Sequence, residues 1–332
     1  MAGTISPDRI LHEMADLWVT LGKQGEGETG VLRACSMTLV VAAEESDDTQ
    51  AIGETLAALM PEHPSRAIVI RFRAEDHRAL DARVFAQCWM PFGHRQQICC
   101  EQIEITASDA SMSDLAAVML PLKVPDLPVF LWCRSPRIFH LDAFKQLAAM
   151  AQKVVVDTAA FDDPAAAVRE LAAMTAAGRA VADLSWTRLT RWREIIAQIF
   201  ANRAYLANLP CVSGIAIAHR GTRVPTTALY LAAWLLNGLA KIGCHSRVSF
   251  TADGGEPTWR LCSVELRVPD NPDPIASITL AEGRAAEIRT GGLLSKALLP
   301  ALTDYALMRE ELSIPGRDPA FEQSLAASVN LA

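Results

Sequence analysis

Apolar and polar residues follow two periods along this chain, and the changes between them predict where helices and strands occur. Between Ile10 and Gly22 the apolar residues recur every three or four positions, which is typical of an amphipathic helix. The segment 66–72 is instead rich in β-branched residues, which favours a strand. In the first half we expect further helices at about 48–60, 112–123, 143–151 and 158–178, and further strands at about 36–41, 84–90, 97–106, 129–133 and 153–157.

The second half shows the same change of period. We expect a helix from Trp186 to about Ala204, with Ser185 as its N-cap. A final helix is expected to begin near Gly292, and the small, polar tail after Ile314 is expected to be loosely held. The remaining elements predicted here are a strand at about 212–218, a long helix at 226–242, and strands at about 247–251, 259–268, 275–280 and 285–289.

Strands that alternate with helices predict an α/β (α+β) fold. A chain of 332 residues is expected to form two domains. We predict an N-terminal α/β domain over 1–180 and a C-terminal α/β domain over 181–332, each a mixed β-sheet packed with helices. The short neighbouring strands between residues 66 and 106 indicate an antiparallel part of the first sheet. Both halves run strand, helix, strands, so the order is compatible with a structural pseudo-repeat.

Charge and hydropathy narrow the class of protein. The net charge is −7, whereas broad nucleic-acid binding needs a concentrated basic face, so no nucleic-acid partner is expected. The most apolar stretch, 227–240, falls short of the ~20 apolar residues that span a membrane, so we expect a buried helix there and no membrane partner. Asp8, Glu13 and Asp16 stand where a signal peptide would be basic and then apolar, which favours a cytoplasmic location.

The cysteines are scattered, and most lie in apolar, strand-like runs. Free cysteine packs as a small hydrophobic residue. In a long chain that is expected to be cytoplasmic, reduced core thiols are the expected state, so we predict no structural disulfide. The eight cysteines are at positions 35, 88, 99, 100, 133, 211, 244 and 262.

One motif resembles a cofactor site and is rejected. Gly25, Gly27 and Gly30 spell G-x-G-x-x-G. A dinucleotide site needs this motif after a strand and before a helix, but here it follows a helix and precedes a strand. Glu26 and Glu28 would also repel a phosphate. The sequence contains no phosphate loop, nucleophile elbow or recognised metal-ligand spacing, so we expect no cofactor, no metal and no catalytic residues.

The segment Trp186–Glu194, WTRLTRWRE, is the first candidate binding site. At helical spacing, one apolar stripe contains Trp192, and Trp186 and Arg193 lie seven positions apart on its margin. Two interpretations stay open. Either the stem of Arg193 covers apolar surface and its charged end lies in water, or the guanidinium binds a carboxylate, a phosphate or a partner chain. The full stripe is Leu189, Trp192, Ile196 and Phe200.

The arginines of this segment are expected to differ in their partners. We favour a partner inside the protein for Arg193, because the stripe beside it packs into core. We favour a partner outside the protein for Arg188 and Arg191, which lie on the other side of the stripe.

Two other segments contain candidate residues. Arg66 follows the turn His63-Pro64-Ser65 and could bind an anion, but we favour an internal ion pair. A proline-bracketed loop with Pro125, Asp126 and Pro128 leads into a strand that contains Trp132. We interpret this loop as structural, because prolines and buried aromatic residues need no function to explain them.

Several short sequence motifs (phrases), taken together, are specific to one family. They run in order from about residue 30 to 290, and the sharpest is the W-x-R-L-x-x-W-R-E phrase at 186–194. On the basis of these motifs, the chain resembles the glucose-6-phosphate dehydrogenase assembly protein (OpcA) family. The other phrases are MTLVV, HPSRAIVI, ICCEQIEI, VPDLPVFLWC, KVVVDT and TTALYLAAWLL.

The resemblance implies a two-domain protein without catalytic activity. Its partner would be glucose-6-phosphate dehydrogenase, the NADP-dependent first enzyme of the oxidative pentose phosphate pathway, whose active oligomer it would promote. Self-association of the chain is left open. The alternative is a sugar-phosphate-binding α/β enzyme or metabolite sensor in which Arg66, Arg188 and Arg193 bind phosphate, since the arginine fork suits that group.

Overall fold

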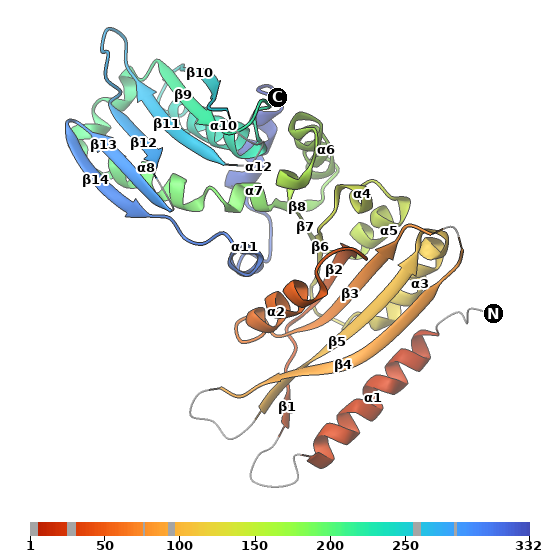
Figure 1. The fold of residues 1–332 in the computed structure, drawn as a ribbon. Coiled ribbons are helices and arrows are strands. Elements are labelled where there is room, and N and C mark those ends of the chain that lie inside the picture. The colour runs from red at the N-terminus through yellow and green to blue at the C-terminus, as the bar shows by residue number, and fades with distance from the viewer. Residues whose placement is uncertain (1–5, 25–30, 76, 92–96, 255–259, 282–283) are drawn as a thin grey trace. The chain divides into compact units, whose positions relative to one another are not determined.

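The computed structural model describes residues 6–24, 31–75, 77–91, 97–254, 260–281 and 284–332 (Figure 1). The glycine motif at 25–30 and the expected strand start at Trp259 lie outside the described residues. The chain forms two compact units, one of Met1–Val156 with Met308–Gly316 and one of Asp157–Leu307 with Arg317–Ala332. The predicted α/β fold with a mixed sheet in each half is confirmed. The predicted domain boundary after residue 180 stays a prediction.

The first unit is built on a sheet in the order β1-β5-β3-β2-β6-β7, in which every neighbouring pair is parallel. The central strand β2 is buried along nearly its whole length, as expected for a strand covered on both faces. The added strand β4 is antiparallel to β5, which confirms the expected antiparallel part. The strands are β1 (Val31–Arg33), β2 (Met37–Glu44), β3 (Ser65–Arg73), β4 (Leu80–Trp89), β5 (Gln97–Ser108), β6 (Val129–Cys133) and β7 (Lys153–Val156).

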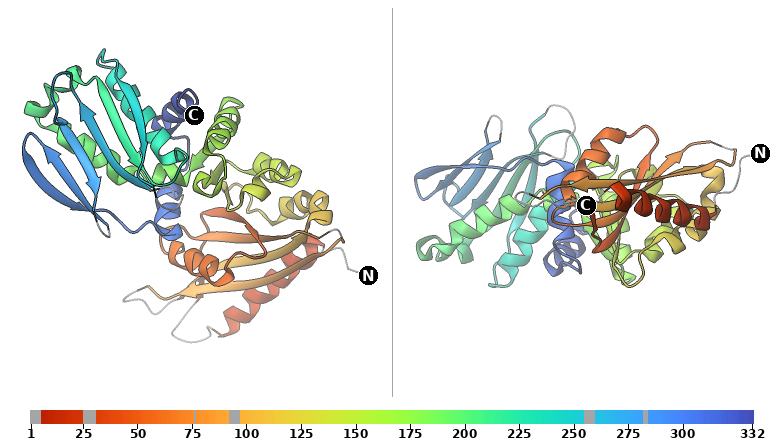
Figure 2. Two further views of the ribbon diagram at one scale, coloured as in Figure 1. Left: turned by 45° about the horizontal axis from the view of Figure 1, so that its top comes forward. Right: turned by 90° about the horizontal axis from the view of Figure 1, so that it is seen from below.

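Helices cover both faces of this sheet. Figures 1 and 2 show α2 against one face and α1 and α3 against the other. The side chain of Asp48 accepts the backbone N–H groups of Gln50 and Ala51, which fixes the start of α2. The helices are α1 (Pro7–Gln24), α2 (Thr49–Leu59), α3 (Met112–Leu122), α4 (Pro136–Phe139) and α5 (Asp142–Met150). The segment 308–316, which contains the end of α11 (Asp304–Leu312), completes the unit.

The prediction that the chain contains no disulfide is wrong, because Cys88 and Cys99 are joined. These residues stand directly opposite each other on the antiparallel strands β4 and β5, with their Cα atoms 4.0 Å apart. Two cysteines in that register are close enough to bond. The prediction relied on local apolar context, and the sequence did not indicate which positions the register brings together.

The second unit contains a sheet in the order β10-β9-β11-β12-β13-β14. Only β9 and β10 are parallel, and the other neighbours are antiparallel. Figure 2 shows helices gathered on one face of this sheet. The strands of the unit are β8 (Ala180–Asp183), β9 (Gly214–His219), β10 (Arg247–Ala252), β11 (Leu261–Arg267), β12 (Ala276–Leu280), β13 (Ala285–Thr290) and β14 (Leu293–Leu298). Its helices are α6 (Pro164–Ala176), α7 (Leu184–Thr187), α8 (Thr190–Ala201), α9 (Arg203–Leu206), α10 (Thr226–Ala240) and α12 (Pro319–Ser328).

The central helix of this unit is α10, which packs against α12 and β9. Leu229, Tyr230 and Leu231 are all fully buried, so the expectation of a buried helix in this stretch is confirmed. No helix among the described residues has the length and apolar character that crossing a bilayer requires.

Three predictions in the second half are wrong. The expected helix near Gly292 is strand β14, because Gly291 and Gly292 both have positive φ and form a tight hairpin turn after β13. The tail after Ile314 is ordered as α12. The expected helix from Trp186 to Ala204 is divided into α7, α8 and α9, and its N-cap is Asp183 rather than Ser185.

Candidate functional site

Arg66 lies in β3, and its guanidinium is buried inside the first unit. Its Nε donates to Glu101 Oε2 at 2.5 Å, and its Nη1 donates to the carbonyl oxygen of Leu122 at 2.7 Å. Glu101 also accepts from Trp18 Nε1 at 2.6 Å and pairs with Arg33 at 2.5 Å. The favoured interpretation of Arg66 as an internal ion pair is confirmed.

The proline-bracketed loop connects α3 to β6 and has the contacts of a structural loop. Asp126 has a φ of 63°. The carbonyl oxygen of Pro128 accepts a backbone N–H of β2 at 2.9 Å. Trp132 is fully buried in β6, and the guanidinium carbon of Arg134 lies 4.6 Å from its ring centroid. Pro125 and Pro128 therefore frame the approach to a core strand.

Trp186 and Arg193 meet although the helix between them is interrupted. The guanidinium carbon of Arg193 lies 3.6 Å from the Trp186 ring centroid, and Nη2 donates to Thr190 Oγ1 at 2.9 Å. Trp186 is 2% exposed and donates from Nε1 to Asp318 Oδ2 at 2.9 Å. The ring also packs against Phe321. These contacts lie within the second unit, in agreement with the internal partner favoured for Arg193.

The expectation that Arg188 has its partner outside the protein is corrected. Its Nη1 and Nη2 donate to the two carboxylate oxygens of Asp157 at 2.6 and 2.7 Å. This bidentate pair is nearly buried on the arginine side, where 8% of the side chain is exposed. Arg191 also has a partner in the chain, Glu194 at 3.0 Å, but 34% of its side chain is exposed. Trp192 is buried in the apolar stripe.

The arginines of the alternative phosphate-binding cluster already have partners inside the units to which they belong. Arg66 and Arg188 each hold a carboxylate, and Arg193 stacks on a tryptophan. A phosphate would therefore have to compete with an internal partner at each of the three residues.

A buried carboxylate that the sequence did not suggest organises the second unit. Asp183 accepts four hydrogen bonds: from Thr158 N at 3.1 Å, Thr158 Oγ1 at 2.6 Å, Ser185 N at 2.9 Å and Tyr230 Oη at 2.8 Å. Burial raises the pKa of Asp183 to about 6. Burial and the neighbouring Asp183 charge raise the pKa of Tyr230 well above its usual value. Asp183 thus ties β8 and α7 to α10.

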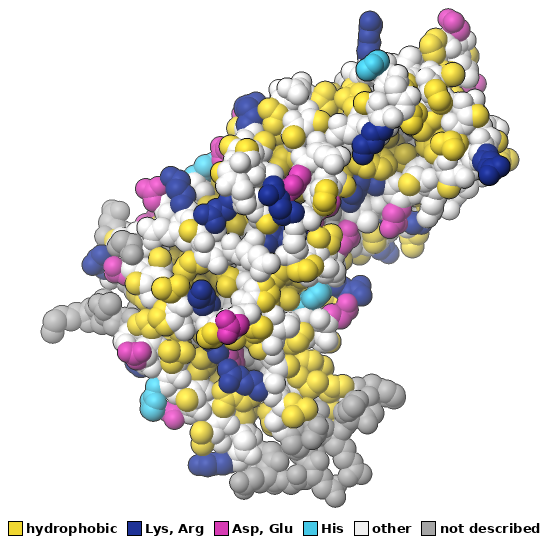
Figure 3. Space-filling model, turned by 180° about the vertical axis from the view of Figure 1, so that it is seen from behind, with side chains coloured by type: hydrophobic (Ala, Val, Ile, Leu, Met, Phe, Trp, Pro, Cys, Tyr) yellow, Lys and Arg dark blue, Asp and Glu magenta, His cyan; other side chains and the backbone are white. Residues whose placement is uncertain are grey.

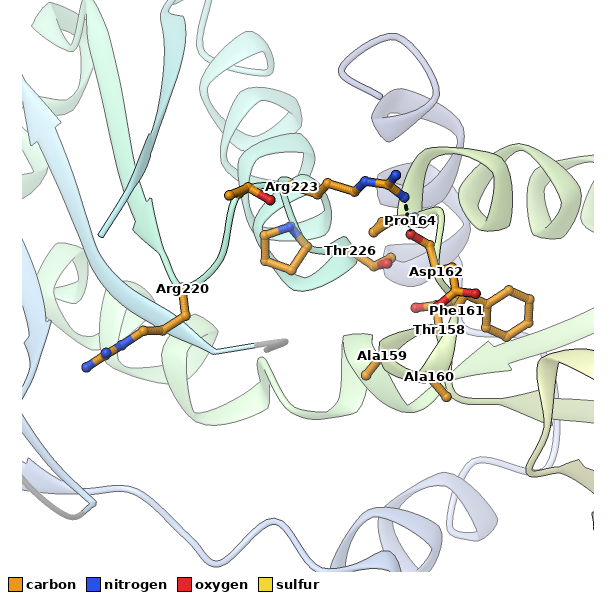
Figure 4. Close-up of a pocket in the computed structure, with 11 residues that line it drawn as sticks. Thr158, Ala159, Ala160, Phe161, Asp162, Pro164, Arg220, Arg223 and Thr226 are labelled. Atoms are coloured by element: carbon orange, nitrogen blue, oxygen red, sulfur yellow. Dashed lines mark hydrogen bonds between the residues drawn. The ribbon is translucent and has the colours of Figure 1, made fainter. Parts of the chain in front are cut away.

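A pocket of about 500 Å³ lies in the second unit (Figure 4). One wall is the segment 158–164, and the other is the loop between β9 and α10. Arg223 reaches across and donates from Nη1 to the carbonyl oxygen of Asp162. Thr226, the first residue of α10, lines the pocket, and its hydroxyl is on the side facing Thr158 and Asp162. The side chain of Arg220 points away from the other labelled residues.

Sequence reasoning missed this pocket because its parts come from distant segments. Thr158 and Asp162 lie in a stretch that was expected to be helical from 158, whereas the described residues form a short 3₁₀ helix, Thr158–Ala160, before α6 begins at Pro164. The sequence marked the start of α10 at Thr226, but not that residues 158–164 lie beside it.

The described residues contain no group of histidine, cysteine, aspartate or glutamate side chains that could hold a metal ion. The glycine motif rejected as a dinucleotide site lies outside them.

Comparison with known families covers most of the chain. Residues 57–173 match the glucose-6-phosphate dehydrogenase subunit N-terminal domain, and residues 179–325 match the C-terminal domain of the same subunit. Both matches belong to one family of dehydrogenase assembly proteins.

Curated relatives in cyanobacteria carry the provisional name OxPP cycle protein OpcA. The protein from Nostoc punctiforme is 25% identical over 306 residues, covering 81% of this chain and 65% of the relative. The protein from Synechocystis sp. is 30% identical over 150 residues, covering 45% of this chain and 31% of the relative. The chain thus spans less than two thirds of the length of these relatives.

Solved structures offer a weaker likeness. A dehydrogenase from Chromobacterium violaceum is 10% identical, with a TM-score of 0.48 over 89% of this chain and 94% of the other. Similarity at this level carries no argument about function.

Proposed function

Because this chain belongs to the glucose-6-phosphate dehydrogenase assembly (OpcA) family, we propose that it is a non-catalytic partner that binds glucose-6-phosphate dehydrogenase and favours its active oligomer. The observation that carries the proposal is the match of both family domains, over 57–173 and 179–325. The provisional names of the relatives support a role in the OxPP cycle. We place the encounter with the enzyme in the cytoplasm.

The internal use of charged residues supports a binding role over an enzymatic one. The arginines that the alternative enzyme would need for phosphate are engaged with Glu101, Asp157 and Trp186. A guanidinium that is already paired and largely buried is a poor ligand for a substrate, because substrate binding would first have to break the internal pair. A partner protein needs only an accessible surface.

The surface that we propose for the enzyme contact is β14, the edge strand of the second sheet. Strand order ends at β14, so its outer edge offers backbone groups for pairing with another chain. Leu294 and Leu298 are 51% and 66% exposed, and they alternate onto the same face as Lys296. Exposed leucines on an edge strand are unusual in a protein without a partner, since native edges are commonly protected by charge or bulges.

The face drawn in Figure 3 does not suggest a charge-driven contact. Figure 3 shows basic and acidic side chains interspersed over the face that it draws, with hydrophobic side chains between them. If long-range electrostatic attraction drove the association, a broad area of surface with charges of one sign would be expected. An apolar edge with a single cation therefore fits the proposal better.

The test combines activity with mass measurement. The purified chain is titrated into glucose-6-phosphate dehydrogenase from the same source, and both the reaction rate and the enzyme's mass by light scattering are followed. A partner that favours the active state acts through its higher affinity for that state, so activation should saturate and should depend on enzyme concentration. The chain alone should not reduce NADP in the presence of glucose 6-phosphate.

A matched pair of variants tests the proposed surface. Leu294→Lys/Leu298→Lys should weaken activation by about tenfold or more, as expected for the loss of a contact worth above ~1.4 kcal/mol. Val19→Lys, at a position on α1 that is 56% exposed, is the control and should activate normally. Unchanged rate and mass of the enzyme after addition of the wild-type chain would refute the proposed function. Normal activation by the β14 variant alone would refute only the surface.

A further inference from the structure

The pocket at the start of α10 has no part in the proposed dehydrogenase contact, and its chemistry points to a small ligand. We propose that this pocket binds a phosphate group, with Thr226 and Arg223 as its donors. Three separate observations on the described residues lead to this assignment.

The first observation is the uncapped start of α10. This helix has 15 residues and begins at Thr226 after Pro225, with no hydrogen bond from a side chain at its N-cap. The N–H groups of Ala228 and Leu229 already donate to the carbonyl oxygen of Pro225, but the helix dipole still places a partial positive charge at this end. Such an end is suited to an anion, and here it opens into a pocket.

The second observation is the hydroxyl of Thr226. The residue is 2% exposed, and its Oγ1 has no hydrogen-bond partner among the described residues. A buried hydroxyl without a partner destabilises the fold, so nearly all buried polar groups are paired. Because Thr226 lines the pocket, a bound acceptor there would supply the missing hydrogen bond.

The third observation is the position of Arg223. One N–H of its guanidinium is fixed to the carbonyl oxygen of Asp162, which orients the planar group across the pocket. Arginine has five N–H donors, so this single bond leaves others to reach an anion. The nearby carboxylate of Asp163 accepts the backbone N–H of Ala166 at the start of α6. The exposed carboxylates of Asp162 and Asp163 are the groups that oppose an anion.

The size of the pocket indicates more than a free ion. A volume of about 500 Å³ falls within the range of small-molecule sites. The β9–α10 loop turns through Gly221, which has a φ of 81° and is buried, so a side chain would be strained at this bend. The site recognises a phosphate group, which inorganic phosphate and phosphorylated metabolites share. The ligand is one of these two.

The experiment is calorimetric titration of the intact chain, without the dehydrogenase, so that it can fail independently of the proposed function. The probes are inorganic phosphate, glucose 6-phosphate and, as the uncharged match, glucose. We expect saturable binding of a phosphate-bearing probe and none of glucose. Tighter binding of the ester identifies a metabolite site, and binding of inorganic phosphate alone identifies the free ion as the ligand. Binding of neither phosphate-bearing probe would overturn the proposal.

Variants distinguish this site from general anion attraction. Thr226→Val keeps the shape of the side chain but removes the donor, so the unliganded protein should melt no lower than wild type while the Kd rises about tenfold. Arg223→Gln should raise the Kd by a similar factor or more. Arg220→Gln is the charge-matched control and should leave the Kd within about twofold, because its guanidinium points away. Equal loss of affinity in Arg220→Gln and Arg223→Gln, or unchanged affinity in Thr226→Val, would overturn the proposal.

Discussion

Asp183 shows how a single residue can organise the second unit. It is fully buried and accepts hydrogen bonds from two groups of Thr158, from Ser185 and from Tyr230. Nothing in its local sequence distinguishes it from an ordinary helix cap, which it also is. Thr158 and Tyr230 lie 25 and 47 positions away. Sequence reasoning could therefore predict a cap in this region but not a polar centre.

The raised pKa of Asp183 predicts a pH dependence of stability. Burial raises the folded-state pKa to about 6, above the value of about 3.9 for an unfolded chain. The folded state therefore holds its proton more tightly, so this contribution to stability is fully present below about pH 4 and is lost as the pH rises to about 6. The loss amounts to about 3 kcal/mol, at 1.36 kcal/mol for each unit.

Urea denaturation between pH 4 and 7 measures this effect. The free energy of unfolding of wild type, relative to that of Asp183→Asn, should fall with rising pH and level off above about pH 6.5. Asp142→Asn is the control, because the pKa of the exposed Asp142 is lowered by its hydrogen bond to Lys145. That variant should show no such fall relative to wild type. A difference between wild type and Asp183→Asn that stays constant with pH would contradict the prediction.

The arginines show what residue type alone can and cannot predict. Arg66 forms the internal ion pair that was favoured for it, with Glu101 as its partner. The partner of Arg188 was wrongly expected outside the chain. Helical projection placed Arg188 on the outer side of one continuous helix, but the turn between α7 and α8 directs it toward Asp157 instead.

At the scale of elements, the sequence predicted most helices and strands within a few residues. The strand at 129–133 and the start of the helix at 226 agree with β6 and α10. Errors occur where periodicity is weak. β14 has exposed leucines on both of its faces, so it lacks the alternation of a half-buried strand, and only Gly291-Gly292 marked it as the second arm of a hairpin.

α12 is the element whose importance the sequence concealed. Asp318 caps it and Pro319 stands at its first position, which together form a standard helix start. Phe321 and Leu325, four residues apart, are both 1% exposed. Phe321 packs edge-on against Tyr230 at 5.5 Å, so the helix closes over α10. Two fully buried apolar side chains therefore hold the tail in place.

This arrangement predicts a large effect at Phe321. Phe321→Ala should lower the free energy of unfolding by about 3–5 kcal/mol, because it removes a buried ring and leaves a cavity. Gln323→Ala, on the exposed side of the same helix, is the matched control and should change stability by less than about 0.5 kcal/mol. Chemical denaturation followed by tryptophan fluorescence measures both. Equal stability of the two variants would contradict the packing described for α12.

At the scale of the whole molecule, the path of the chain is more complex than two consecutive domains. The polypeptide leaves the first unit after Val156, returns to it at 308–316, and then re-enters the second unit. Composition and periodicity predicted two α/β parts because each half contains both kinds of element. They could not predict the return, because the buried contact that accompanies it joins residues 158 positions apart.

That contact joins Lys153 of β7 to Glu311 of α11. Lys153 is 1% exposed, and its Nζ donates to Glu311 Oε2 at 2.8 Å, to the carbonyl oxygen of Glu311 at 3.2 Å and to that of Ile314 at 2.9 Å. An ammonium this deeply buried is stable only when its donors are satisfied. The segment 308–316 therefore supplies the acceptors that Lys153 of β7 requires.

The pair predicts a characteristic pattern of double-mutant energies. Lys153→Met should destabilise the protein by about 3–5 kcal/mol, because it leaves the buried carboxylate of Glu311 without its cation. Lys153→Met/Glu311→Leu should regain most of that loss, since an apolar pair of similar volume is often tolerated. Hydrogen exchange should locate the effect of the single variant in β6 and β7. Arg309→Ala, which breaks the neighbouring exposed pair with Glu62, is the control and should cost under about 1 kcal/mol. If Lys153→Met costs no more than Arg309→Ala, the ion pair does not hold the returning segment, and the first unit must retain 308–316 through the buried side chains of Met308 and Leu312 instead.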